Sequence, residues 1–263
     1  RTEASSDWPT SASPMPEPEG IDSSPHWDEV VDVICVGPGP GVLAYGICCA
    51  AADLDVLMVD LPSVPDEVLV GLIDAMTEDL GDPPPDGEQA VGMLGPEPTP
   101  VPSGRRATMK SPRDVPLEPF VGHRLRDFSS RCLASPYGMM FTEVPDLLTP
   151  MCTDSGESVT AAVLGRYRSP LAASLREQAD EFGLTGGDRL IGLVIEAGRI
   201  AGATLDTPAG RRLVGATAGI VVSVGPMPAG LAEPPGADLD ADLEVAVVGR
   251  RFGRFARLEL VRR

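Results

Sequence analysis

Two short apolar runs, residues 31–36 and 56–59, flank a glycine-rich turn at 37–41 and an alanine-rich segment at 42–52. Short runs rich in β-branched residues are typical of buried strands. The alanine-rich segment suits a helix that packs closely on a sheet, because small side chains let the two backbones approach. The pattern therefore predicts a strand, a tight turn, a helix and a second strand, which together form a parallel βαβ unit.

Glycines and one acidic residue indicate what kind of ligand this unit could bind. Gly37 allows a sharp exit from the strand, Gly39 lets the backbone approach a pyrophosphate, and the helix N-terminus offers unpaired N–H groups. Asp60 ends the second strand, 23 positions after Gly37, where a carboxylate can accept hydrogen bonds from ribose hydroxyls. We therefore predict a dinucleotide site that includes Gly37, Gly39, Gly41 and Asp60. An acid disfavours a 2′-phosphate, so NADP is the least expected ligand, and NAD remains an alternative.

A second patterned block follows later in the chain. Three runs are separated by short glycine-containing turns, at residues 189–196, 199–206 and 211–214. This spacing predicts a three-stranded antiparallel meander. A fully apolar run at 219–224 ends in Gly225 and predicts a buried parallel strand. Together the two blocks predict an α/β fold, Rossmann-like, with a parallel sheet and a three-stranded β-meander.

Both blocks resemble the FAD-binding domain of flavoproteins of the fumarate reductase and 3-ketosteroid dehydrogenase type. Gly37, Gly39 and Gly46 match that family's G-x-G-x-x-G-x-x-x-G/A pattern. The resemblance implies that the chain binds FAD. It also implies that the backbone near Leu190 contacts adenine and that Gly225 ends the strand that runs past the cofactor.

The chain departs from that family in several places. Val42 stands where the third glycine is expected, Pro38 and Pro40 remove two N–H donors from the turn, and Asp60 replaces the usual Glu. A proline-rich stretch replaces the second FAD-contacting segment, no catalytic set of side chains is evident, and we expect no substrate-binding cap domain in this chain.

Two hypotheses about function follow from these matches and departures. The chain is an FAD-binding oxidoreductase component, dehydrogenase-like and without its own cap, or a cofactor-free descendant that acts as a structural or assembly subunit of a larger complex.

Composition narrows the possible ligands. The chain has 263 residues, 43% of them hydrophobic, and a formal net charge of −18, which argues against nucleic acid and anionic membrane surfaces as partners. No apolar run approaches the roughly 18 residues of a membrane span. Only two histidines occur, neither at ligand spacing, so we expect no metal site. Five cysteines in apolar settings, none in a C-x-x-C pair, favour reduced thiols and a cytoplasmic location.

We expect three parts along the chain. Residues 1–27 are rich in serine, proline and acids and predict a disordered or partner-bound tail. Residues 28–225 form the FAD-binding-like domain, with a proline-rich insertion at about 81–119. Residues 226–263 form a C-terminal extension with two arginine-rich strands. Apolar stripes at helical spacing predict further helices within 65–80, 120–135 and 169–182. The acidic tail and the arginine-rich C-terminus are candidate docking surfaces for a protein partner or an oligomer.

Overall fold

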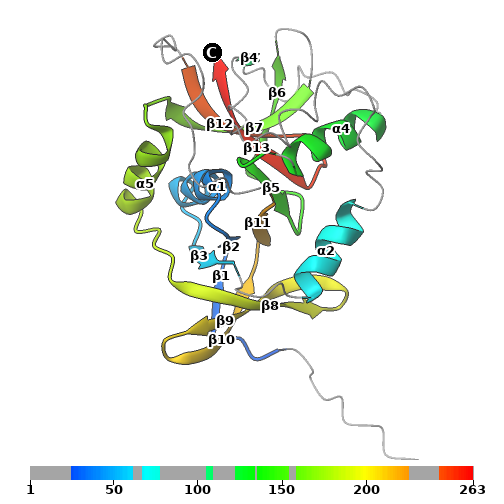
Figure 1. Ribbon diagram of the computed structural model, residues 1–263, viewed down its shortest axis with the longest axis vertical. Coiled ribbons are helices and arrows are strands. Elements are labelled where there is room, and N and C mark those ends of the chain that lie inside the picture. Colours follow the sequence, from blue (N-terminus) through cyan, green and yellow to red (C-terminus); the bar gives the residue numbers. More distant parts are fainter. Residues whose placement is uncertain are drawn as a thin grey trace, which may run out of the picture.

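The computed structural model describes residues 25–61, 67–77, 105–108, 122–133, 135–153, 158–224 and 243–262. The helices are α1 (Pro40–Ala51), α2 (Glu67–Thr77), α4 (Gly122–Leu133) and α5 (Leu171–Glu181). The strands are β1 (Glu29–Val31), β2 (Val33–Val36), β3 (Val56–Asp60), β4 (Arg105–Thr108), β5 (Gly138–Phe141), β6 (Thr149–Thr153), β7 (Ser158–Arg166), β8 (Asp188–Glu196), β9 (Arg199–Thr207), β10 (Gly210–Ala216), β11 (Ile220–Ser223), β12 (Leu243–Gly249) and β13 (Phe255–Arg262). These strands form one mixed sheet in the order β1-β10-β9-β8-β3-β2-β11-β5-β13-β12-β7-β6-β4 (Figure 1).

The centre of the sheet contains the predicted βαβ unit. Strand β2 pairs in parallel with β3 on one side and with β11 on the other, and α1 makes the connection from β2 to β3. The predicted meander is also present, because β8, β9 and β10 pair in antiparallel succession. The predicted parallel pairing is present in these central strands, and the sheet as a whole is mixed. Among the described strands, parallel pairing runs through β11, β2, β3 and β8, between β1 and β10, and between β13 and β4.

The two faces of the central strands pack against different layers. Successive side chains of a strand point to opposite faces. Val33 and Cys35 therefore lie in the core formed with α1 and α5, whereas Ile34 and Val36 lie in the core formed with the meander. In Figure 1, α1 and α5 lie together on one side and the meander curves below the central strands. The result is three layers: helices, central sheet and meander.

The second half of the sheet closes on itself. Strand β4 pairs with both β6 and β13, so β13, β12, β7, β6 and β4 form a ring. The sequence did not predict β4, β6 or β7. Strands β12 and β13, assigned above to a C-terminal extension, lie inside the sheet between β5 and β7. Val247 and Leu258 are fully buried in the same core as α1, so this part of the chain helps to hold the helix that begins at the glycine turn.

Part of the arginine-rich C-terminus also serves packing. Arg257 is 8% exposed, and its Nε donates to the buried Glu259 carboxylate at 2.7 Å. The guanidinium groups of Arg250 and Arg257 lie 5.1 and 5.8 Å from the centre of the Phe128 ring on α4. A cation over an aromatic face is attracted by the ring quadrupole. These arginines therefore help to attach α4 to the end of the β12–β13 hairpin.

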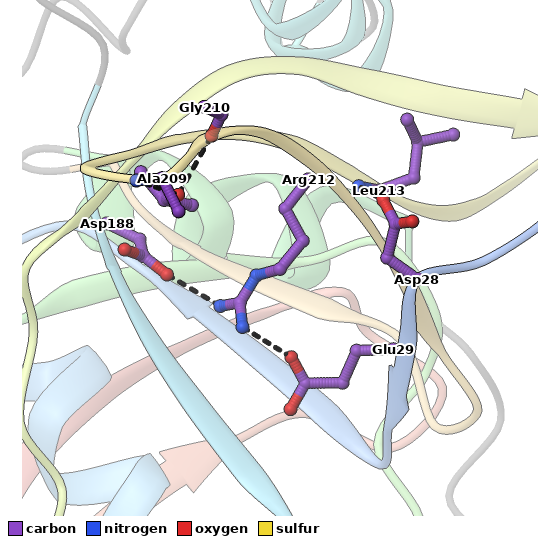
Figure 2. A network of polar contacts seen from close by, with 8 residues as sticks. Asp28, Glu29, Asp188, Ala209, Gly210, Arg212 and Leu213 are labelled. Carbon is purple, nitrogen blue, oxygen red and sulfur yellow. Dashed lines mark hydrogen bonds and ion pairs between the residues drawn. The ribbon is translucent and has the colours of Figure 1, made fainter.

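The start of the described chain is anchored on the meander. Of the tail predicted at residues 1–27, only 25–27 lie within the described residues. The Trp27 ring lies against Gly202 and Gly215, and a Cβ on Gly202 would come within 2.7 Å of it. Asp28 then donates its N–H to the Leu213 carbonyl at 3.0 Å and accepts the Leu213 N–H on its carboxylate at 2.8 Å (Figure 2). Gly215 thus leaves room for the tryptophan that fixes the entry into β1, and Gly202 leaves room for both the tryptophan and the Val214 carbonyl oxygen.

Candidate functional site

The glycine turn links the ends of β2 and β3. Gly37 follows β2 with φ of +105°, in the region that favours glycine, and its N–H donates to the Val59 carbonyl at 2.8 Å. Gly39 is the N-cap of α1, and its carbonyl accepts the Leu43 N–H at 3.1 Å. The amides of Gly41 and the residue after it have no partner within the helix, because they precede its first hydrogen bond. The turn therefore directs the N-terminus of α1 toward the carboxyl edge of the parallel strands.

The side chain of Ser223 fills the space beside this turn. Ser223 is the last residue of β11, and a Cβ on Gly37 would lie 2.9 Å from its Cβ. A Cβ on Gly39 would overlap Ser223 Oγ, well inside the contact distance that real Cβ atoms keep. The hydroxyl is buried and has no hydrogen-bond partner among the described residues. A buried donor without a partner carries a desolvation cost of about 1–3 kcal/mol.

Gly41 has a different neighbour. A Cβ at this position would overlap the carbonyl oxygen of Tyr137, a backbone atom, and would lie 2.9 Å from the Met139 side chain. Close packing of α1 on the chain entering β5 thus depends on Gly41. Val42, at the position where the third glycine of the family pattern is expected, is fully buried in the core of the helical layer.

Asp60 lies where the sequence placed it, at the carboxyl end of β3. Its side chain is exposed, and no hydrogen bond or ion pair to it is found among the described residues. Gly186, in the loop before β8, passes close by, since a Cβ there would be 3.7 Å from Asp60 Oδ1. Gly37 and Asp60 are brought together through β3, because Gly37 bonds to the residue before Asp60. A carboxylate at this edge is free to accept hydroxyl donors.

Leu190 lies on β8, next to the residue that pairs with Asp60. Its side chain is buried between the central sheet and the meander, so only its backbone can face a ligand. Pairing between β3 and β8 ends at Asp60 and Arg189, and from Leu190 onward β8 has no strand partner on that side among the described strands. Gly225, the sixth predicted site residue, lies outside the described residues.

An ion-pair network holds the start of β8 in place. Arg212 of β10 donates to Asp188 at 2.6 Å and pairs with Glu29 at 2.7 Å, as Figure 2 shows. All three side chains are partly exposed, so each pair contributes below about 1 kcal/mol. Asp188 is paired in register with Val59, so the network positions the strand end on which Asp60 lies.

The cysteines around the site are not suited to nucleophilic chemistry. Burial raises the pKa of Cys35 well above its usual range, and burial raises the pKa of Cys48 and Cys49 to about 12. A thiol reacts as its thiolate, which these groups do not form near neutral pH. No group of three or more potential metal ligands occurs within the described part of the chain. Among these residues, no helix is long and apolar enough to cross a membrane.

Sequence reasoning missed Ser223 as a member of the site. The only local signal is a hydroxyl at the end of an otherwise apolar strand. Which way that hydroxyl points depends on the pairing of β11 between β2 and β5, which the sequence alone does not give.

No protein-family model and no curated protein matches this sequence. Solved structures match it in part. The open conformation of a flavocytochrome c3 fumarate reductase is 12% identical with a TM-score of 0.33, over 72% of this chain and 33% of that one. The 3-ketosteroid-Δ4-(5α)-dehydrogenase of Rhodococcus jostii RHA1 is 15% identical with a TM-score of 0.33, over 77% and 47%. A myxobacterial FAD-dependent halogenase, CndH, is 14% identical with a TM-score of 0.28, over 72% and 36%.

This chain spans less than half the length of each of these three structures. The described residues form a βαβ unit and a further parallel strand between a helical layer and a three-stranded meander. This arrangement is set in a large mixed sheet with few helices among the described residues.

Proposed function

We propose that this chain binds FAD at the glycine turn between β2 and α1 and is the FAD-binding component of an oxidoreductase. The observation that carries the proposal is the buried hydroxyl of Ser223, which faces the turn and has no partner among the described residues. A phosphate oxygen at the N-terminus of α1 would supply the missing acceptor.

The residues present would suit the ADP half of the cofactor. The amides of Gly39 and Gly41 and the Ser223 hydroxyl would bind pyrophosphate oxygens, and Asp60 would accept hydrogen bonds from the ribose hydroxyls. The unpaired edge of β8 at Leu190 would offer backbone groups to adenine. Gly225 would let the end of its strand pass the cofactor. Bound FAD supplies hydride transfer, and the protein orients it and excludes water.

A second candidate function is supported by a separate observation. Ser223 occupies the space that Gly37 and Gly39 leave open, so packing within the chain already requires both glycines to be small. Pro38 and Pro40 also remove two donors from the turn. A cofactor-free descendant of the fold would keep these features. It would act as a structural or assembly subunit, docking through its acidic N-terminal segment and its arginine-rich C-terminus.

The visible spectrum of the gently purified chain, before and after added FAD, tests the proposal. We expect flavin absorption bands that survive desalting, and about tenfold weaker FAD retention in Asp60→Asn, since a charged hydrogen bond is worth about 1.5–3 kcal/mol. The matched control is Asp180→Asn, another exposed acid, on α5. A colourless protein that takes up no added FAD contradicts the proposal and favours the assembly subunit.

A further inference from the structure

A row of alternating charges crosses four neighbouring strands beside the glycine turn. Its members are paired in register from strand to strand, and in order they are Asp60 of β3, Arg189 of β8, Asp206 of β9 and Arg211 of β10. All four side chains are exposed. Among the described residues, no hydrogen bond or ion pair to the Arg189 guanidinium is found. Arg189 is therefore an exposed cation next to the carboxylate that the proposed site assigns to the ribose.

Arg189 lies on the same face of the sheet as Asp60. Successive side chains of a strand point to opposite faces. Val59 and Leu190 are buried in the core toward the meander, so the residues next to them, Asp60 and Arg189, lie on the face against which α1 packs. The glycine turn, Asp60 and Arg189 then follow one another at the end of β2, the end of β3 and the start of β8, which are neighbours in the sheet.

This order matches the order of groups in an adenine dinucleotide. Neighbouring strands lie about 4.8 Å apart, so each of the three positions is one strand farther from the turn. With a pyrophosphate at the N-terminus of α1 and a ribose at Asp60, the next group along the ligand is the base, and it would lie over the start of β8. That is where the Arg189 side chain is.

The chain around Arg189 leaves space for a flat group. Gly186 and Gly187 come shortly before it. A Cβ on Gly187 would meet nothing within 4 Å, and one on Gly186 would meet only Asp60 Oδ1, at 3.7 Å. Pairing with β3 ends at Arg189, and the register with β9 shifts directly after Leu190. Irregularities of this kind are common beside functional sites, because they end strand pairing and redirect side chains.

The charges around Arg189 favour its planar face as the binding surface. An acid is paired in register on each side of it, Asp60 on β3 and Asp206 on β9. The local field is therefore not suited to a further anion such as a 2′-phosphate. A guanidinium is also planar and delocalised, and it stacks on aromatic rings. Every nucleobase offers a π-face for such a contact. Stacking on a base needs no excess of positive charge.

We infer that Arg189 is a specificity-determining residue of the proposed site and that its guanidinium stacks on the adenine ring. The inference rests on the proposed function, because the pyrophosphate at the turn and the ribose at Asp60 set where the base lies. The Leu190 backbone would meet the edge of the base, and Arg189 would cover its face. The two together would give the site its preference for ligands that carry adenine.

The test is isothermal titration calorimetry of the full chain with ADP, which carries no flavin. We expect Arg189→Ala to bind ADP about tenfold more weakly. Arg189→Lys keeps the charge without the planar face and should bind no better than Arg189→Ala. Arg189→Tyr restores a planar face without the charge and should recover most of the affinity. Arg211→Ala, the other exposed arginine of the row, is the matched control and should bind ADP as the unchanged chain does.

Four results would overturn the inference. The unchanged chain may not bind ADP at all. Arg189→Lys may bind tightly where Arg189→Tyr does not, which assigns Arg189 a role through its charge. Arg211→Ala may weaken binding as much as Arg189→Ala, which indicates a long-range field. Adenosine 2′,5′-bisphosphate may bind more tightly than AMP and lose that advantage in Arg189→Ala, which assigns Arg189 to a phosphate.

The same variants separate this inference from the FAD proposal. A chain that binds ADP through Arg189 and takes up no FAD refutes the FAD proposal alone. A chain that retains FAD equally well with and without the Arg189 side chain refutes the stacking inference alone.

Discussion

Replacing Gly39 by alanine tests what the glycine turn is for. The backbone at Gly39 has φ of −63° and ψ of 136°, which alanine adopts without strain. Most of the cost must therefore come from space, with a smaller cost from placing alanine at the N-cap of α1. The new Cβ would overlap Ser223 Oγ and lie 3.1 Å from Ser223 Cβ, while the next nearest atom, the Pro136 carbonyl oxygen, is 3.8 Å away. One side chain thus accounts for the whole conflict.

The expected magnitude follows from two opposing terms. Forcing an extra methyl group into a packed site costs about 1–3 kcal/mol. Alanine also restricts the unfolded chain and returns about 0.4–1 kcal/mol. We expect Gly39→Ala to lower the free energy of unfolding by about 1–2 kcal/mol. Ser223→Ala removes both the overlapping oxygen and a buried hydroxyl without a partner, so on its own it should cost nothing or stabilise the cofactor-free chain.

The assay is a double-mutant cycle by urea unfolding, followed by circular dichroism. The double variant Gly39→Ala, Ser223→Ala should recover most of the loss, with a coupling energy of about 1–2 kcal/mol. Gly71→Ala is the matched control, since nothing lies within 4 Å of its added Cβ on α2, and it should stabilise by roughly 0.5–1 kcal/mol. If the two site substitutions prove additive within about 0.5 kcal/mol, Ser223 does not fill the turn and the reasoning fails.

Two further predictions concern pH. The Asp32 carboxylate accepts the Asp55 N–H at 2.9 Å, which is the main cause of its lowered pKa, and the Thr217 hydroxyl at 2.7 Å. Asp32→Asn should lower the free energy of unfolding by about 1 kcal/mol at neutral pH. A lowered pKa stabilises the fold only while the carboxylate stays ionised. In thermal melts, the difference between the variant and the unchanged chain should therefore shrink as the pH falls below about 4. Burial raises the pKa of Cys48 and Cys49 to about 12 from 9.0 in the unfolded chain, so stability is retained below pH 9 and lost as the pH rises toward 12. Cys48→Ala should make that alkaline decline shallower, and an equally steep decline would contradict the assignment.

Local sequence signals were sufficient for the central part of the fold. The run at 56–59 and the meander runs appear as β3 and β8–β10 with bounds shifted by no more than a few residues, because each carries its own turn signals and apolar pattern. Strands β6 and β7 carry no such signal. β6 reads TPMCT, with a proline inside it, and β7 begins with small and polar residues. Their burial depends on β12, some eighty residues later, so pairing across the ring determines them and local propensity does not.

The same distinction applies to the candidate site: local spacing predicts some of its features, and pairing between distant segments determines the others. The position of the turn, of Asp60 and of the meander strand follows from spacing along the chain, because each lies at the end of a predicted element. What the sequence could not provide is the neighbour of each glycine. Gly41 faces Tyr137 and Gly39 faces Ser223, and both contacts join segments about one hundred or more residues apart in the chain. A glycine motif read from sequence therefore identifies where the backbone needs room and not what takes it.

That ambiguity makes the Ser223 hydroxyl more informative than the glycines. Gly37 and Gly39 must be small whether or not a pyrophosphate binds, since Ser223 already lies against them. The hydroxyl is different, because a buried donor without a partner lowers stability unless something completes its hydrogen bond. If FAD completes it, Ser223→Ala stabilises the cofactor-free chain and weakens FAD retention together. If the fold has lost its cofactor, the same substitution stabilises the chain and changes nothing else. The stability change has the same sign in both cases, so stability alone does not distinguish them. The FAD titration of Ser223→Ala does, because FAD retention falls only if the turn is a cofactor site and Ser223 is not merely a packing residue.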